Sequence, residues 1–188
     1  MVFTLKTVSW LSLLAIISGA QAQQPTTDYT FVNNCPTAIK LYRHNAFSTD
    51  LAKGANVTRQ ESLATGYFYT DANGGGGSQT DPSTKFATYW AENDPKYYYY
   101  IVKNTTSFNT GMRIEPSHPE VDGFCQSVTC DAADCETAFP RRTVFTDLGP
   151  ISPTPPTEPP SPPLYSCPFE GVTYVVTFCP SGTFPASA

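Results

Sequence analysis

The sequence of 188 residues predicts a mainly β fold that is held together by disulfide bonds. It contains 11 Tyr and 12 Phe, which favour strands, and 18 Pro and 12 Gly, which interrupt them. Six cysteines are present, and long helical periodicity is missing. Together these features are typical of a small β protein from an oxidising compartment.

The first 22 residues have the pattern of a secretory signal peptide. Lys6 lies in a short n-region, "VSWLSLLAII" forms an apolar core, and "SGAQA" predicts cleavage before Gln23. A transmembrane anchor is the alternative, but this apolar core is too short to span a bilayer. We therefore expect a secreted, extracellular protein without a membrane anchor, with residues 23–188 as its single domain.

Charge argues against nucleic acid as a partner. The net charge of −5 becomes −6 once Lys6 is removed, and Arg141-Arg142 is the only adjacent basic pair. A nucleic-acid-binding surface needs a positive footprint for the phosphates. The sequence predicts an acidic monomer that binds neither nucleic acid nor membrane.

Several short strands can be placed by their β-forming residues. Tyr29–Val32 and Ala38–Tyr42 lie on either side of the turn-like "NNCPT", and residues 56–70 predict a further strand pair. The run Gly74–Gly77 predicts a flexible loop, because a phosphate cradle would need Lys-Ser/Thr and a helix after the glycines. A helix of one or two turns is expected near "CDAADCETAF", opened by Asp131.

The tyrosine-rich segment "KYYYYIVKN", residues 96–104, predicts a strand that carries candidate binding residues. Alternation places Tyr97, Tyr99 and Ile101 on one face, and the neighbouring side chains on the other. One face should belong to the core, and the second is either an aromatic binding surface or more packing. Propensity favours packing, because aromatic residues are good strand formers.

Two further features predict an exposed, modified surface. Residues 150–163, "PISPTPPTEPPSPP", are expected to form a stiff, exposed connector whose Ser and Thr residues are candidate sites for O-linked sugars. A ligand for an SH3-type domain is the alternative, and it is disfavoured in a secreted chain. Asn56-Val57-Thr58 and Asn104-Thr105-Thr106 are acceptors for N-glycosylation, so Asn56 and Asn104 are expected on surface loops.

Six cysteines in a secreted chain predict three disulfides, and spacing alone leaves fifteen connectivities open. A zinc site is the alternative, but His44 and His118 do not lie at zinc-finger spacing from any cysteine pair. We expect no metal and no cofactor. The cysteines are Cys35, Cys125, Cys130, Cys135, Cys167 and Cys179.

Four segments of the sequence resemble segments of the thaumatin-like proteins. "YTFVNNCP" is similar to the family's opening strand and first cysteine, and "YVVTFCPSG" to its last strand and last cysteine. "CQSVTCDAADC" resembles its C-x4-C pair, and "SFNTGMRIEP" its GFN-x-P-M strand. The resemblance covers residues 28–41, 82–135 and 165–182, while the Gly-rich cysteine signature of plant members is absent.

The resemblance implies a thaumatin-like β-sandwich and a disulfide scheme. It implies Cys35–Cys179, which joins the two ends of the chain, and Cys125–Cys167. The family's partners for Cys130 and Cys135 lie in a helical region that this sequence lacks, so we expect these two residues to bond each other. The proline-rich segment 150–163 takes the place of that region, so the second domain is reduced.

The resemblance also allows a test for catalysis. Glycoside hydrolysis needs two carboxyl groups that flank the bond, and some thaumatin-like proteins carry an acidic cleft. In a gapless alignment, the family's cleft acids fall on Thr88, Ile101 and Thr106, none of which is acidic. The other acids nearby are expected to be solvated loop charges; these are Asp71, Asp81, Glu92 and Asp94. We therefore predict no catalytic residues and no enzyme activity.

Three functions stay open at this point. The first is a non-catalytic thaumatin-like protein that binds cell-wall polysaccharide of the β-1,3-glucan class, or acts in defence or host interaction, through Tyr97, Tyr99 and Ile101. The second is a protein-interaction role, as an antimicrobial factor, inhibitor or effector. The third is a weak, divergent endo-β-1,3-glucanase. The short form with its linker suggests a fungus or another microbial eukaryote.

Overall fold

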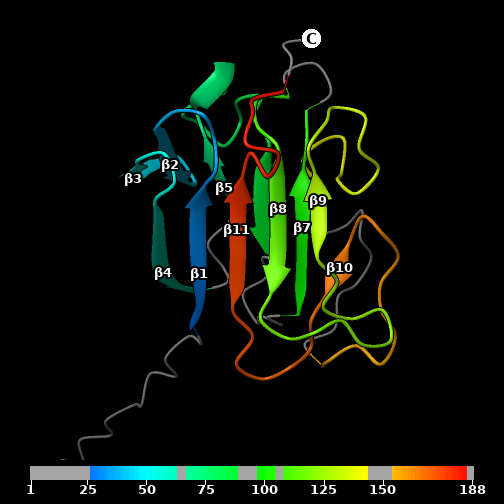
Figure 1. Ribbon diagram of the computed structural model, residues 1–188. Coiled ribbons are helices and arrows are strands. Elements are labelled where there is room, and N and C mark those ends of the chain that lie inside the picture. Colours follow the sequence, from blue (N-terminus) through cyan, green and yellow to red (C-terminus); the bar gives the residue numbers. More distant parts are fainter. Residues whose placement is uncertain (1–25, 63–66, 89–96, 105–107, 144–153, 186–188) are drawn as a thin grey trace, which may run out of the picture.

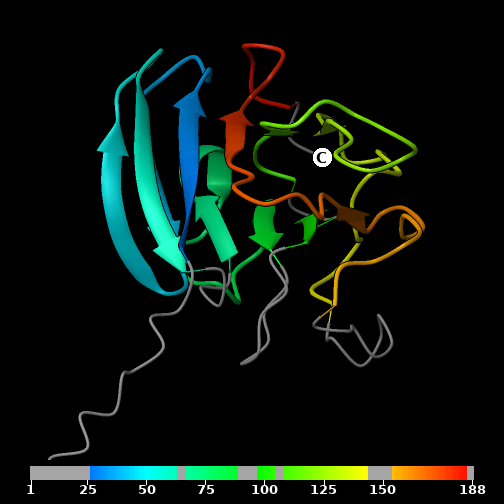
Figure 2. The same cartoon turned by 90° about the horizontal axis from the view of Figure 1, so that it is seen from below.

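The computed structural model describes residues 26–62, 67–88, 97–104, 108–143 and 154–185. The predicted signal peptide lies outside these residues. The described residues form two β-sheets that pack against each other, as Figures 1 and 2 show. Within them, no helix is long and apolar enough to cross a membrane.

The five-stranded sheet brings together the two ends of the chain. Its order is β4-β1-β11-β8-β9, and β1 and β11 are parallel neighbours, whereas all other pairs are antiparallel. The strands are β1 (Thr26–Asn33), β4 (Asn56–Ser62), β8 (Met112–Pro116), β9 (Val128–Cys130) and β11 (Tyr174–Phe178). The last strand, β11, is therefore the central strand of this sheet.

The six-stranded sheet is antiparallel throughout and has the order β10-β7-β6-β5-β2-β3. Its strands are β2 (Ile39–Arg43), β3 (Ala46–Leu51), β5 (Tyr67–Thr70), β6 (Lys85–Thr88), β7 (Tyr98–Val102) and β10 (Tyr165–Ser166). A 3-10 turn, η2 (Ala72–Gly74), follows β5.

Aromatic side chains fill the space between the two sheets. Burial alternates along β1, so Tyr29 and Phe31 point inward. The Tyr29 ring stacks on Tyr174 at 5.6 Å between centroids, and Phe31 lies 4.7 Å from Phe68 of the opposite sheet. Such ring pairs add packing energy beyond the apolar area that they bury, so this core holds the two sheets together.

The six-stranded sheet is also covered on its other side. Tyr67, Tyr69 and Tyr100 belong to a second buried cluster, which Leu164 and Phe139 cover. Every residue of β5, β6 and β7 is consequently buried. This explains why "YFYT" and "YYYIV" are continuous aromatic and apolar runs, since a strand buried on both faces needs no polar alternation.

Three disulfides are present: the two that the family resemblance implies, and the Cys130–Cys135 bond that was expected because the family's partners for these cysteines are missing. Cys35–Cys179 joins the loop after β1 to the end of β11, across 144 residues of sequence. Cys125–Cys167 spans 42 residues, and Cys130–Cys135 closes a loop of five. The Cys35–Cys179 bond therefore holds the last strand, β11, to β1, its neighbour in the sheet.

The predicted strands occur, but two details of the prediction are wrong. Residues 56–70 contain two strands, β4 and β5, yet these belong to different sheets and do not pair with each other. The segment after β9 forms no helix, because Cys130–Cys135 and a hydrogen bond from Thr137 Oγ1 to the Thr129 carbonyl oxygen fold it into a tight loop.

The glycine-rich loop is packed, contrary to the flexible loop expected from its composition. Asp81 Oδ2 accepts a hydrogen bond from the Ser78 N–H at 2.8 Å, and Tyr69 donates one to the Gly77 carbonyl oxygen at 3.0 Å. A Cβ at Gly76 would lie 2.1 Å from the Asp81 Cβ. Glycine is therefore needed here for close approach rather than for mobility.

The described part of the proline-rich segment, residues 154–163, contains no strand or helix. Most of its side chains are exposed, and the buried Leu164 follows directly. Asn56 is exposed at the start of β4, and Asn104 is half-buried just after β7. Residues 150–153 of the segment lie outside the described ranges.

Candidate binding groove

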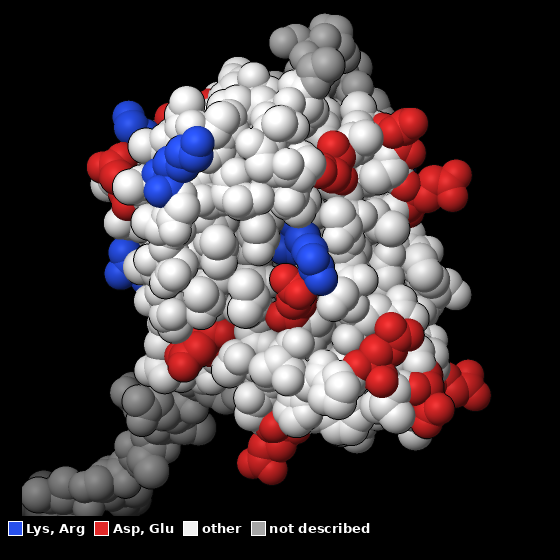
Figure 3. Space-filling model, viewed as in Figure 1, with Lys and Arg blue, Asp and Glu red and all other residues white. Residues whose placement is uncertain are grey.

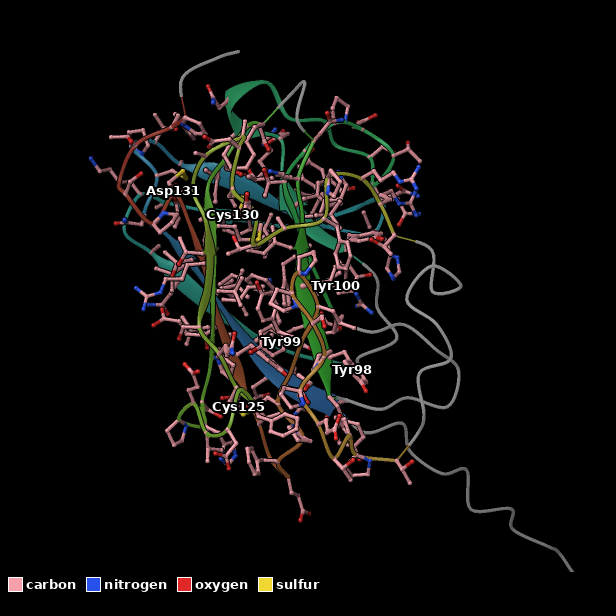
Figure 4. The ribbon with its side chains drawn as sticks, turned by 90° about the vertical axis from the view of Figure 1, so that its right-hand side faces the viewer. Tyr98, Tyr99, Tyr100, Cys125, Cys130 and Asp131 are labelled. Atoms are coloured by element: carbon pink, nitrogen blue, oxygen red, sulfur yellow. A yellow bond between two sulfur atoms is a disulfide. The ribbon has the colours of Figure 1, made fainter. Side chains whose placement is uncertain are left out.

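Two of the three predicted binding residues are buried and do not reach the surface. Tyr99 and Ile101 each have a relative exposure of 0% and lie in the core between the sheets. Figure 4 shows Tyr99 pointing into this space, whereas Tyr98 and Tyr100 leave β7 on the opposite side. The tyrosine strand thus has two packed faces, and neither face of β7 is an aromatic binding surface.

Tyr99 has a structural role that its burial explains. Its hydroxyl donates a hydrogen bond to the Gln126 carbonyl oxygen at 2.5 Å, and its ring stacks on Tyr165 at 5.8 Å between centroids. Burial raises the pKa of the Tyr99 hydroxyl above its ordinary value. Each of these observations fits a residue that fixes the core against the loop before β9.

Tyr97 differs from the other two predicted residues. It immediately precedes β7 in a turn, is half-buried, and packs against the Tyr98 and Tyr100 side of the sheet rather than beside Tyr99. The prediction that Tyr97 shares a face with Tyr99 and Ile101 was therefore wrong, because the strand begins at Tyr98. Of the predicted binding residues, Tyr97 is the one that lines a hollow on the surface.

The positions to which the family's acids were aligned cannot hold a catalytic pair. Ile101 lies in the core, Thr88 is buried at the end of β6, and Thr106 lies outside the described residues. The outer side of the six-stranded sheet carries cations instead. Lys85 Nζ lies 5.1 Å from the Tyr69 ring centroid, and the Arg142 guanidinium lies at the same distance over Tyr67.

Lys85 is an unusual residue of this outer layer. Its Nζ donates hydrogen bonds to the carbonyl oxygens of Asp81 at 2.7 Å and of Ser83 at 2.9 Å. Burial, together with the nearby Arg142 charge, lowers the pKa of Lys85 to about 8, and Asp81 partly opposes this. Burial also raises the pKa of the neighbouring Tyr69 hydroxyl to about 12.

The other acids considered in the sequence hold loops in place. Asp71 Oδ2 accepts a hydrogen bond from the Tyr42 hydroxyl at 3.0 Å, and Asp81 caps the Ser78 N–H. Asp71 and Asp50 do line a small hollow of about 270 Å³, but Lys40 also lines it and pairs with Asp50 in the β2–β3 register. Glu92 and Asp94 lie outside the described residues.

A larger groove, of about 460 Å³, lies at one end of the sandwich. It is the lower end in Figure 1, where β1 and β11 begin. Four separate parts of the chain contribute the side chains that matter most for recognition. These are Asp28 from β1, Gln60 from β4, Tyr97 before β7, and Pro168, Phe169, Glu170 and Thr173 before β11.

Strand register and the second disulfide build this groove. Asp28 and Gln60 are direct partners in the β1–β4 register, so their side chains lie on the same face. The Cys167 N–H donates a hydrogen bond to the Tyr97 carbonyl oxygen at 2.6 Å, and Cys167 is bonded to Cys125. The segment that carries Phe169 is therefore fixed beside Tyr97.

Phe169 is the most exposed aromatic residue of the groove, at 38%. Its ring lies 5.2 Å from the His118 ring, and Thr173 is anchored to Ser117 by two hydrogen bonds of 2.9 Å. An exposed aromatic ring that is held by neighbours loses little conformational freedom on binding. Phe169 is accordingly well suited to contact a ligand.

The groove's composition suits a polar ligand with apolar faces. Ligand sites typically combine apolar walls with a few well-placed polar groups, and this one combines two aromatic rings with two carboxylates and an amide. Within the described residues, no group of three or more His, Cys, Asp or Glu could hold a metal ion. The groove can offer hydrogen-bond acceptors to hydroxyls and amines, and flat apolar surfaces to ring faces.

Sequence reasoning missed Asp28, Gln60, Phe169 and Glu170. The alternation of β1 would have placed Asp28 on the solvent face. Its proximity to Gln60 and Phe169, however, depends on strand register and on the Cys125–Cys167 bond. No local pattern carries that information.

Comparisons with known proteins identify the fold. No family model and no curated protein matches the sequence. Among solved structures, the thaumatin-like xylanase inhibitor TLXI superposes with a TM-score of 0.52 at 15% identity, covering 81% of this chain and 99% of that one. The protein elicitor MoHrip2 from Magnaporthe oryzae gives 0.47 at 15% identity, covering 81% and 98%. The chain has the mainly β, thaumatin-like fold.

Proposed function

We propose that this protein is a secreted, non-catalytic thaumatin-like protein that binds a cell-wall polysaccharide in defence or host interaction. In this proposal, residues 1–22 are removed, residues 23–188 form the working domain, and Asn56 and Asn104 are glycosylated. The single observation that carries the proposal is the end groove, with its fixed, exposed Phe169 beside Tyr97 and polar side chains.

Sugars and this groove are chemically matched. A pyranose ring has an apolar C–H face that packs on an aromatic ring, and hydroxyls that need hydrogen-bond partners. Tyr97 and Phe169 supply the rings, and Asp28, Gln60 and Glu170 supply acceptors. The groove is open at the surface, so a polymer can lie across it without threading an end.

Binding without cleavage follows from the absence of acids at the aligned positions. A glycosidase needs one carboxyl group as acid and another as base or nucleophile on either side of the bond. Ile101 and Thr88 stand where two of the family's acids were aligned, and Asp71 is engaged with Tyr42. A weak glucanase would need a different carboxylate pair.

The test is co-sedimentation with insoluble β-1,3-glucan. Phe169→Ala should weaken binding roughly five- to tenfold, the size expected for one aromatic contact, and should leave the melting temperature nearly unchanged because Phe169 is exposed. Phe47→Ala is the matched control, since Phe47 is 54% exposed on β3. Equal loss with both variants, or full binding by Phe169→Ala, would reject the groove as the site.

A protein target is the second candidate function, and the fold likeness to a xylanase inhibitor favours it. Here the same exposed aromatic would insert into a partner protein, as hot-spot residues do. Capture of a secreted glycosidase by the wild type but not by Phe169→Ala, without any polysaccharide binding, would support this candidate over the first.

A further inference from the structure

The charge of the end groove suggests which sugars it takes. Asp28 and Glu170 both line it, and none of the described residues that line it is Lys, Arg or His. Figure 3 shows Asp and Glu over the lower part of the molecule in this view, where no Lys or Arg is seen; Asp and Glu also lie at its upper left and upper right, and Lys and Arg at its left side and centre. With a net charge of −5, the whole chain adds to a negative field at this end.

Such a groove discriminates between ligands by their charge as well as by their shape. An anionic ligand would be repelled, and a neutral one would leave the two carboxylates without a charged partner. A cationic ligand would gain charge-assisted hydrogen bonds to Asp28 and Glu170, which are stronger than neutral ones. Charge complementarity of this kind gives specificity above all.

The remaining lining argues for a sugar rather than a basic peptide. Tyr97 and Phe169 offer flat apolar surfaces, and Gln60 and Thr173 lie beside the carboxylates. A sugar ring carries hydroxyls on nearly every carbon and can use all of these partners together. A lysine side chain, by contrast, has donors only at its end.

We infer that the groove formed by Asp28, Gln60, Tyr97, Phe169 and Glu170 binds a polymer of amino sugars whose amines are free and protonated, in preference to neutral or N-acetylated polymers. The inference rests on the proposed function and deepens it, since it names the ligand class of the same groove. The ring faces pack on Tyr97 and Phe169, while the ammonium groups approach Asp28 and Glu170.

Calorimetry with three oligosaccharides of equal length tests this inference. The probes are oligomers of glucosamine, of N-acetylglucosamine and of β-1,3-linked glucose, at a pH where the glucosamine amine is protonated. The expected order places glucosamine first, with affinity that falls as salt is added. The double variant Asp28→Asn/Glu170→Gln should bind the glucosamine oligomer roughly three- to tenfold more weakly, and its loss of affinity for the two uncharged oligomers should be smaller, because Asn and Gln keep an oxygen acceptor but lose the charge.

A matched control separates the groove from the general acidity of the protein. Glu136→Gln removes one exposed carboxylate in the loop after β9, at the opposite end of the sandwich in Figure 1. It should leave all three affinities unchanged. A loss with Glu136→Gln equal to that with the double variant would overturn the assigned site.

The remaining outcomes distinguish the inference from the proposed function. Equal affinity for all three oligomers would overturn the preference for amino sugars and leave polysaccharide binding intact. Binding of none of them would refute the proposed function itself. An oligolysine that binds more tightly than the glucosamine oligomer, and displaces it, would reassign the groove to basic peptides.

Discussion

At the scale of single residues, aromatic side chains divide into those that build the fold and those that meet solvent. Tyr99 sits in the core with its hydroxyl bonded to Gln126, while Phe169 stands 38% exposed against His118. Aromatic residues thus serve packing in one place and, in the proposed function, recognition in the other, and burial distinguishes the two. The proposed function therefore rests on Phe169 and Tyr97.

Lys85 gives a pH-dependent prediction at this scale. Its pKa of about 8 in the folded state lies below the value of 10.5 for an unperturbed lysine, because burial disfavours its charge. Between these two values the unfolded chain holds more protons, so the free energy of unfolding rises with pH. Relative to Lys85→Met, the wild type should gain about 2 kcal/mol between pH 7 and pH 10.

Urea denaturation of both proteins across this pH range measures the effect. The tyrosines that ionise at high pH are common to both proteins, so their contribution cancels in the difference. Two curves that stay parallel from pH 7 to pH 10 would show that Lys85 titrates as an ordinary exposed lysine.

At the scale of elements, the parallel pair β1–β11 is the feature that organises the fold. It places the first and last strands side by side in the centre of one sheet, and Cys35–Cys179 fixes that contact. Both sulfur-bearing residues are fully buried. Non-local pairing of this kind costs much chain entropy, and a disulfide removes part of that cost from the unfolded state.

Removal of Cys35–Cys179 should therefore destabilise the protein more than removal of Cys130–Cys135. In the chain-entropy model, closure of 144 residues contributes about 5 kcal/mol and closure of five residues about 2 kcal/mol. Paired Cys→Ala variants, compared by denaturant unfolding, provide the measurement. A larger loss from the short loop would contradict loop closure as the source of the stability.

At the scale of elements, sequence patterns predicted where strands lie better than they predicted which strands pair with each other. The strands around Tyr29, Tyr100 and Val176 follow from β-forming runs, whereas β3 was missed because "AFSTDL" is half polar and mostly exposed. β4 pairs with β1 and not with β5, and this choice depends on how the two sheets pack against each other, which the local sequence does not encode. The missing helix after Cys130 reflects a disulfide that constrains only a few residues.

At the scale of the whole molecule, the two sheets and the outer aromatic layer bury most aromatic side chains of the described strands. The broad outer side of the six-stranded sheet carries buried tyrosines with Lys85 and Arg142. The end groove, in contrast, is open and negatively charged. Its lining residues come from five separate segments of the chain, so the sequence could predict Tyr97 as a member but not the site.

The central claim is that this protein binds a wall polymer without cleaving it. The most direct test is to bind the wild-type protein to insoluble β-1,3-glucan and to measure the reducing ends that are released over time. We predict no rise above the protein-free control, because the aligned acid positions hold Thr88 and Ile101. A steady release that disappears on Asp28→Asn, Glu170→Gln or Asp71→Asn would contradict the claim and identify the protein as a glucanase.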